Sequence, residues 1–258
     1  MKKTLIEKTA DKLVNAFVNN KIIAPLPTKF TRKLSEAEKL RKLCESKIKD
    51  PIIGFNAAGT GIPVMKKLKE KKPFYASIFE KNFIKSGKKV KINKSTLGVE
   101  LEVCYLIKKN FFSSKGSITM KNVTKHISHM APCIEVIGYR QKKKGITSFG
   151  DLCSDFGANV KFLIGRKQKY KKINIGNLKT NIANEKIKQS VDGNTNTVYI
   201  NPLNSLRFVL NELKKDKVSL DKDFYVFTGS TVGVVPILGK GLYVGKIEKL
   251  GTAKAIIN

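Results

Sequence analysis

The stretch of sequence that decides the fold covers residues 98–107 and reads GVELEVCYLI. Its apolar and β-branched residues predict a β-strand over Val99–Ile107. Because side chains alternate between the two faces of a strand, Glu100 and Glu102 point to the same side, and the apolar residues beside them point to the other. Two carboxylates so close together repel each other, and burial increases that cost. The pair therefore indicates either a bound cation or a solvent-exposed face neutralised by surface lysines.

A third glutamate lies in a similar setting. Residues 131–137 read APCIEVI, which predicts another strand, over Pro132–Ile137, with Glu135 as its one acid. Three carboxylates without a histidine or cysteine partner make an all-oxygen site, which suits Mg²⁺, Mn²⁺ or Ca²⁺ better than Zn²⁺. On the residues alone, the metal site and the solvated face both stay open.

The composition is that of a globular protein. The chain has 258 residues, of which 41% are hydrophobic and 8% aromatic, enough for a substantial core without disulfides. No apolar run approaches the roughly 18 residues that a membrane-spanning helix needs. The charged start, KKTLIEK over residues 2–8, is unlike a secretory signal. We expect a soluble, cytoplasmic protein.

The strong positive charge does not identify a partner. The formal net charge is +31, but only five of the 51 basic residues are arginine, the residue that nucleic-acid readers use for bidentate contacts. Lysine, isoleucine and asparagine are abundant together, as A/T-rich codons would produce on any fold. We therefore expect a solvated basic surface and no specific nucleic-acid partner.

The cysteines and histidines show no clear metal-binding spacing. The four cysteines form no CxxC pair and are expected to be buried free thiols. His126 and His129 are three residues apart, a spacing that places both on one face of an expected helix. No third ligand is obvious near them, so we expect a polar helix surface rather than a metal site.

The chain divides into two expected parts. Residues 1–50 predict a small N-terminal helical lobe, with helices over 5–18 and 35–47, and residues 51–258 predict a β-rich domain. Regular strand–helix alternation is absent, so the fold class is mixed α/β and rich in β rather than a doubly wound sheet. Further strands are expected at Val198–Ile200, Phe224–Phe227 and Leu242–Lys249, and helices near Lys121–His129, Phe149–Lys161 and Ser205–Lys214.

Six motifs then follow one another in an order that resembles a known family. They are an early glycine loop (54–60), a proline and aromatic segment (72–79), the ExE strand (99–103), the third-glutamate strand with Arg140 (131–140), an Asp-containing helix (151–165) and a Gly-Ser turn (228–231). This order resembles the fumarylacetoacetate hydrolase superfamily, most closely its branch of 2-keto-4-pentenoate hydratases and 4-oxalocrotonate decarboxylases. The likeness covers the chain from roughly residue 50 to its last residue.

The resemblance implies a fold and a metal. The fold is a twisted mixed β-roll of the fumarylacetoacetate hydrolase type behind a small N-terminal helical lobe. The implied ligands of Mg²⁺ or Mn²⁺ are Glu100, Glu102 and Glu135. Family members assemble as dimers or larger rings, so we expect a homo-oligomer without membrane association.

The resemblance also implies a substrate class. A small 2-oxo acid would chelate the metal through its carboxylate and 2-oxo oxygens, with Asp155, Ser230 and Thr231 near it. The Gly-Ser turn is as readily explained as the end of a strand. For Arg140, a surface ion pair is expected rather than contact with a second carboxylate.

The sequence departs from the family at its acid–base positions. Where the hydratase branch has an active-site lysine, this chain has Asn56, which cannot titrate. Where the family often has an acid, counting places Lys81, and a shift by one residue places Glu80. Asn56, Glu80 and Lys81 are therefore the candidate catalytic residues.

The favoured function is a metal-dependent lyase, a hydratase or decarboxylase, acting on a 2-hydroxydienoate or 2-oxo acid. One alternative is a C–C hydrolase of acylpyruvate type, a branch that places a His–Glu pair near its nucleophilic water. Another is a non-catalytic, metal-dependent binder of small 2-oxo acids, which Asn56 favours.

Overall fold

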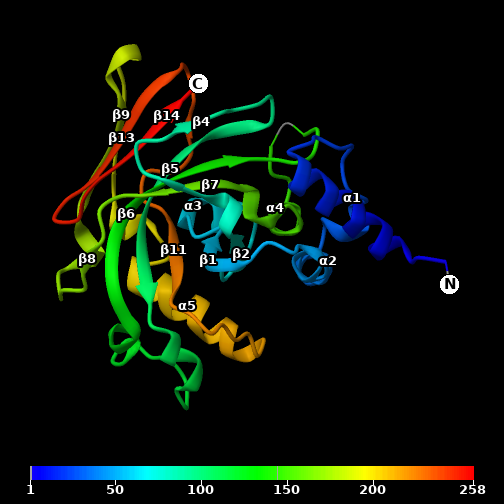
Figure 1. The fold of residues 1–258 in the computed structure, drawn as a ribbon, viewed down its shortest axis with the longest axis horizontal. Coiled ribbons are helices and arrows are strands. Elements are labelled where there is room, and N and C mark those ends of the chain that lie inside the picture. Colours follow the sequence, from blue (N-terminus) through cyan, green and yellow to red (C-terminus); the bar gives the residue numbers. More distant parts are fainter. Residues whose placement is uncertain (1, 144) are drawn as a thin grey trace.

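The computed structural model describes residues 2–143 and 145–258, which form two β-sheets with short helices around them (Figure 1). The α-helices are α1 (Leu5–Asn19), α2 (Leu34–Lys47), α3 (Ile62–Lys67), α4 (Phe149–Ser154) and α5 (Pro202–Lys215). The larger sheet contains β1 (Ile52–Ala58), β2 (Phe74–Phe79), β3 (Phe83–Lys85), β5 (Thr96–Ile107), β6 (Ile127–Gly138), β7 (Asn159–Ile164), β8 (Gln168–Lys169), β11 (Phe224–Ser230) and β12 (Val235–Pro236). The smaller sheet contains β4 (Lys89–Val90), β9 (Lys179–Asn184), β10 (Gln189–Asn194), β13 (Gly241–Ile247) and β14 (Gly251–Ile257).

The larger sheet is mixed and curls into a roll. Its main order is β2-β1-β11-β5-β6-β7-β3, with β12 beside β5 and β8 beside β6. Most neighbours are antiparallel, but β1 and β11 run parallel, as do β3 and β7. The ring of Phe83 on the last strand stacks on Tyr225 of β11 at 6.0 Å between centroids, so the curl brings distant strands together. The mixed, β-rich fold expected from the sequence is confirmed.

Both faces of the two longest strands are buried, and they are buried differently. On one face, Val99 and Leu101 belong to the main core, which also includes residues of α5 and the smaller sheet. On the other face, Cys104 and Cys133 pack with aromatic residues such as Phe162 inside the roll. Because strand side chains alternate, Glu100, Glu102 and Glu135 must share this second, inner face.

Helices α1 and α2 lie side by side at one end of the molecule (Figure 1). Thr4 caps α1 through the backbone N–H of Glu7, whose carboxylate accepts a hydrogen bond from the Thr4 N–H in return. The apolar stripe of α1, with Leu13 and Phe17, packs on α2 and on Phe79 of β2. This packing attaches the helices to the roll.

One buried charge pair strengthens that attachment. Arg41 of α2 is 1% exposed, forms an ion pair with Glu45 at 2.7 Å and lies over the ring of Tyr75. Glu45 in turn accepts hydrogen bonds from the backbone N–H and hydroxyl of Ser77 on β2. A buried ion pair whose remaining oxygens are hydrogen-bonded holds one relative position of helix and strand.

Three expected elements are wrong. The helix near Lys121–His129 is a single 3₁₀ turn (Val123–His126), because the apolar run that follows it pairs as β6. The helix expected over Phe149–Lys161 stops at Ser154, because residues 159–164 pair with β6 as β7. The stretch Val198–Ile200 is a turn before α5, where two non-glycine residues have positive φ.

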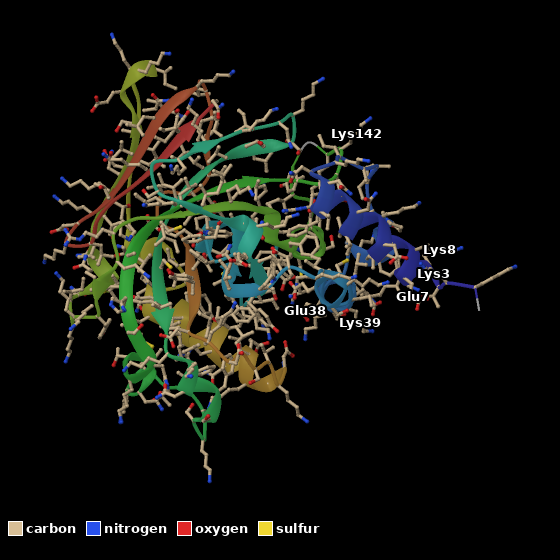
Figure 2. The ribbon with its side chains drawn as sticks, in the orientation of Figure 1. Lys3, Glu7, Lys8, Glu38, Lys39 and Lys142 are labelled. Atoms are coloured by element: carbon tan, nitrogen blue, oxygen red, sulfur yellow. The ribbon has the colours of Figure 1, made fainter. Side chains whose placement is uncertain are left out.

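Within the described residues, no helix is both long enough and apolar enough to cross a membrane. Lysine side chains point outward from the N-terminal helices and from a loop beside them, as the labelled Lys3, Lys8, Lys39 and Lys142 show (Figure 2).

Candidate metal centre

The three glutamates meet where β5 pairs with β6. Glu100 lies directly opposite Glu135, and Glu102 lies opposite Cys133, one step along the same face. One carboxylate oxygen from each glutamate lies within 4.8 Å of the others. Glu102 and Glu135 are each 1% exposed, and Glu100 is partly exposed. Like charges opposite each other are destabilising in a sheet, so this arrangement requires protons or a cation between them.

Each of the two fully buried glutamates, Glu102 and Glu135, accepts a hydrogen bond with one carboxylate oxygen and has its other oxygen available. Oε2 of Glu102 accepts the backbone N–H of Gly229 at 2.9 Å, and Oε2 of Glu135 accepts the side-chain N–H of Asn56 at 3.3 Å. The Oε1 atoms of Glu102 and Glu135 are buried without a hydrogen-bond partner among the described residues. Buried carboxylate oxygens that lack a partner are costly, and a bound divalent cation satisfies them.

The electrostatics agree with the geometry. Burial, followed by the neighbouring Glu102, raises the pKa of Glu100 to about 8. Burial also raises the pKa of Glu102 to about 7, although the hydrogen bond from Gly229 opposes it. For Glu135, burial and then the other two glutamates raise the pKa well above its usual range. The cluster therefore holds protons near neutral pH unless a cation replaces them.

The turn at the end of β11 positions the backbone N–H that donates to Glu102. Gly229 has φ +98°, and a Cβ there would lie 1.7 Å from the hydroxyl of Thr60, so only glycine brings this N–H to the carboxylate. Ser230 donates its hydroxyl to the carbonyl of Gly233, and Thr231 donates both its N–H and its hydroxyl to the carbonyl of Leu101. The structure thus places Ser230 and Thr231 at the site with their hydroxyl protons engaged.

Asn56 lies beside the metal centre and is paired with a second amide. Its side chain is 3% exposed, and its Nδ2 also donates to Oδ1 of Asn159 at 2.9 Å. Asn56 Oδ1 and Asn159 Nδ2 are buried without a partner within the described residues. Asn159 was missed from the sequence, because nothing local distinguishes an asparagine at the start of a strand.

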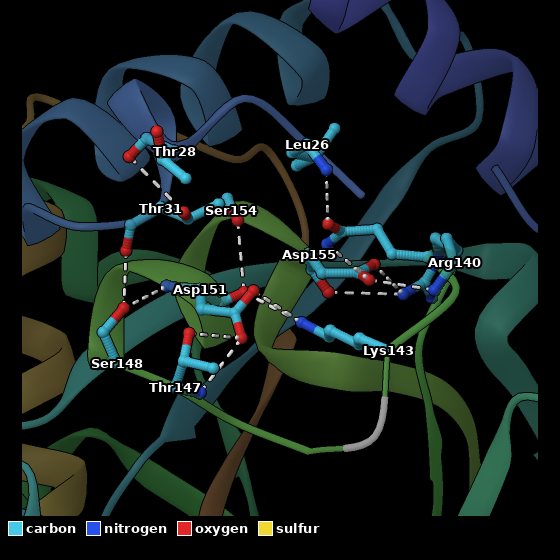
Figure 3. A network of polar contacts seen from close by, with 11 residues as sticks. Leu26, Thr28, Thr31, Arg140, Lys143, Thr147, Ser148, Asp151, Ser154 and Asp155 are labelled. Atoms are coloured by element: carbon cyan, nitrogen blue, oxygen red, sulfur yellow. Dashed lines mark hydrogen bonds and ion pairs between the residues drawn. The ribbon is translucent and has the colours of Figure 1, made fainter. Parts of the chain in front are cut away.

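Asp155 and Arg140 form a buried network elsewhere (Figure 3). Their ion pair measures 2.9 Å, and Asp155 also accepts the backbone N–H of Arg140 and the amide of Gln141. Both residues are nearly fully buried, and neither lines the cavity described below. The surface ion pair expected for Arg140 is wrong, and its guanidinium is unavailable to a second carboxylate. The structure does not bring Asp155 to the cavity.

The other candidates also lie apart from the glutamates. Glu80 is exposed, and the ammonium of Lys81 donates to the carbonyl of Phe17 at the end of α1. His126 ends a 3₁₀ turn and His129 lies on β6, so the shared helix face expected for them is wrong. None of the four lines the cavity.

A cavity of about 860 Å³ opens from the glutamates. Asn56, the three glutamates, Ser230 and Thr231 line it. Its other walls come from α3, from the loop after β6 and from the turn after β11, for example Val64, Ile146 and Val234. These apolar residues were not predictable from the sequence, because only the curl of the sheet brings them together.

No protein-family model and no curated protein sequence matches the chain. Several solved structures, in contrast, match the chain in fold. The structure of 4-oxalocrotonate decarboxylase from Pseudomonas putida G7, complexed with magnesium and adipate, covers 100% of this chain and 99% of its own at a TM-score of 0.87 and 18% identity.

Two further structures match over most of their length. Fumarylpyruvate hydrolase from Pseudomonas aeruginosa, in complex with Mn²⁺ and pyruvate, has a TM-score of 0.57 and 13% identity over 82% of this chain and 91% of that one. A 5-carboxymethyl-2-hydroxymuconate delta-isomerase from Mycobacterium smegmatis has a TM-score of 0.57 and 12% identity over 81% and 80%. The chain therefore has the fold that its resemblance to the fumarylacetoacetate hydrolase superfamily predicts, and it shares that fold over its full length with a 4-oxalocrotonate decarboxylase.

Proposed function

We propose that this protein is a metal-dependent lyase that acts on a 2-oxo acid or its 2-hydroxydienoate tautomer. The observation that carries the proposal is the group of three glutamates at the buried end of a cavity, two of them with an oxygen that has no hydrogen-bond partner among the described residues. The fold is shared with a decarboxylase complexed with magnesium and with a hydrolase complexed with Mn²⁺, which supports a metal-dependent enzyme.

The residues present fit a divalent cation. Glu100, Glu102 and Glu135 supply only carboxylate oxygens, the ligand set that favours Mg²⁺ or Mn²⁺. Such a cation polarises the carboxylate and 2-oxo oxygens of a bound substrate and stabilises the negative charge that develops there.

The chain's own residues position and enclose the reacting group. The N–H of Gly229 and the amide of Asn56 orient two of the glutamates, and apolar side chains form much of the cavity wall around the reacting group. Asn56 donates a hydrogen bond but cannot move a proton. Water addition and decarboxylation both use the same electron sink, so the lyase class is proposed without a choice between them.

A titration and an assay test this proposal. Mn²⁺ should bind the metal-free protein with a stoichiometry of about one, and oxalate, which mimics a chelating 2-oxo acid, should bind only with the metal present. Glu102→Gln should weaken Mn²⁺ binding at least tenfold, whereas Glu185→Gln, at an exposed position, should not. Absence of Mn²⁺ binding contradicts the proposal.

The second candidate is a binder without turnover, and Asn56 in place of a lysine favours it. The assay is consumption of 2-hydroxypenta-2,4-dienoate followed by ultraviolet absorbance. Turnover on the order of 10 s⁻¹ identifies an enzyme, and metal-dependent oxalate binding without turnover identifies a binder. The hydrolase alternative gains nothing from His126 or His129, because neither reaches the cavity.

A further inference from the structure

The cavity has two chemically different ends. The buried end carries the carboxylates, and Glu102 and Glu135 are each 1% exposed there. The walls beyond them are apolar, formed by residues such as Leu68, Leu97 and Leu152. A volume of about 860 Å³ exceeds what a three-carbon chelating acid fills, so the apolar part has room for a longer ligand.

The mouth of the cavity is lined by apolar side chains that remain exposed. Ile62 is 37%, Val64 41%, Ile146 38% and Val234 50% exposed, and all four line the cavity. They come from three separate chain segments: α3, the loop after β6 and the turn after β11. Exposed apolar residues that converge from separate segments on one opening are characteristic of a site for an apolar group.

The loop that carries Ile146 is anchored to the structure (Figure 3). Lys143 forms an ion pair with Asp151 of α4 at 2.8 Å, and the Thr147 N–H donates to the same carboxylate at 3.2 Å. Asp151 is 4% exposed. Two described residues near Ile146, Lys143 and Thr147, therefore contact the same mostly buried carboxylate, which supports the apolar wall at Ile146.

The walls offer little to a second carboxylate. Apart from the three glutamates, Lys67 and Asp192 are the only Lys, Arg, Asp or Glu residues among the described lining residues, and both are exposed. The carboxylate of Asp192 repels an anion, and an ion pair with the exposed ammonium of Lys67 would stabilise a bound carboxylate only weakly. The buried Arg140 is committed to Asp155.

We infer that the substrate is a 2-oxo acid with one carboxylate and an apolar chain of several carbons, which lies along α3, Ile146 and Val234. This inference rests on the proposed function, because the glutamate site must hold the 2-oxo acid end. Burying each methylene of the chain is expected to raise affinity roughly fourfold.

The test compares three ligands on the full-length protein saturated with Mn²⁺, by calorimetry. The ligands are pyruvate, 2-oxohexanoate and 2-oxoadipate, and the last two have the same number of carbons. 2-Oxohexanoate should bind at least tenfold more tightly than pyruvate, and 2-oxoadipate should bind more weakly than 2-oxohexanoate. Equal affinity for pyruvate and 2-oxohexanoate overturns the inference and leaves the proposed function standing, whereas failure of pyruvate to bind overturns both.

Matched variants test where the apolar chain of the substrate lies in the cavity. Val64→Lys should weaken binding of 2-oxohexanoate at least fivefold and leave the affinity for pyruvate unchanged. Leu238→Lys is the control, because Leu238 is 74% exposed and does not line the cavity. If the protein prefers 2-oxoadipate and Lys67→Gln removes that preference, the cavity binds a carboxylate at the end of the ligand far from the glutamates, and the inference is overturned. An unchanged affinity of Val64→Lys for 2-oxohexanoate also overturns it.

Discussion

At the scale of single residues, the amide of Asn56 gives the metal centre an unusual balance of charge. Its N–H groups hold Glu135 and Asn159, but an amide brings no charge to offset three carboxylates. An ammonium at this position would stabilise the ionised glutamates and compete with a cation for them. The asparagine therefore favours metal binding and removes a proton carrier at the same time.

Replacing Asn56 separates these two effects. If the missing lysine limits catalysis, Asn56→Lys should raise hydration of 2-hydroxypenta-2,4-dienoate by about 10²-fold or more and weaken Mn²⁺ binding by repulsion. The measurements are initial rates at saturating Mn²⁺ and Mn²⁺ titration. Asn56→Met is the control of similar length without a charge and should not raise the rate. A wild-type rate that Asn56→Lys leaves unchanged would show that the proton carrier is another group.

Strand alternation was enough to predict that Glu100 and Glu102 share a face, because that relation is local. The network of Asp155 and Arg140 was not predictable in the same way. Their pairing depends on the tertiary contact that brings Arg140, just after β6, to Asp155 at the end of α4, and the sequence alone does not show which acid a buried arginine meets. The same holds for Asn159, whose partner lies 103 residues away.

At the scale of elements, the turn that ends β11 connects a backbone constraint to the metal centre. Gly229→Ala should cost about 3 kcal/mol or more, because the added Cβ meets Thr60 in a left-handed conformation. It should also weaken Mn²⁺ binding through Glu102. Urea unfolding and Mn²⁺ titration measure the two effects.

A neighbouring glycine in the same turn provides the control for that change. Gly233 has φ +72° and nothing within 4 Å of an added Cβ, so Gly233→Ala should cost only about 1 kcal/mol. Equal losses in the two variants would mean that the close approach to Thr60 is unimportant.

The elements predicted from periodicity were right where the pattern was long. Helices α1 and α2 and strand β5 lie where apolar spacing placed them, and the strand predicted over Pro132–Ile137 is the second half of β6. The helix expected over Phe149–Lys161 failed in its second half, because Asn159–Ile164 joins the edge of β6. Tertiary pairing overrides local propensity in such short apolar runs.

At the scale of the whole molecule, the buried carboxylates make stability depend on pH. Glu100 and Glu102 have pKa values of about 8 and about 7, above the ordinary value of 4.5, so the folded metal-free protein binds more protons than the unfolded chain between these limits. Stability from this source is complete below pH 4.5, falls as the pH rises above that value, and is fully lost once the pH has risen through 7 to 8.

Urea unfolding in the presence of a chelator should show this loss, on the order of 6 kcal/mol between pH 5 and pH 8.5. Saturating Mn²⁺ should reduce or reverse the slope, because the cation binds the ionised glutamates. Glu102→Gln should reduce the slope of the metal-free profile, which separates the cluster from the many surface lysines. A profile unchanged by this substitution would contradict the assignment.

The division at residue 50 and the homo-oligomer stay predictions.

The parallel pairing of β1 with β11 has a consequence for how the site forms during folding. Strand β11 lies between β1 and β5, and its register joins Gly54 to Tyr225. The β5–β6 hairpin can pair early, but its carboxylates lack Asn56 and Gly229 until the long intervening chain has closed. During synthesis on the ribosome, the cation-binding site is therefore completed only after β11 has emerged, and until then the hairpin exposes its acids without their native donors.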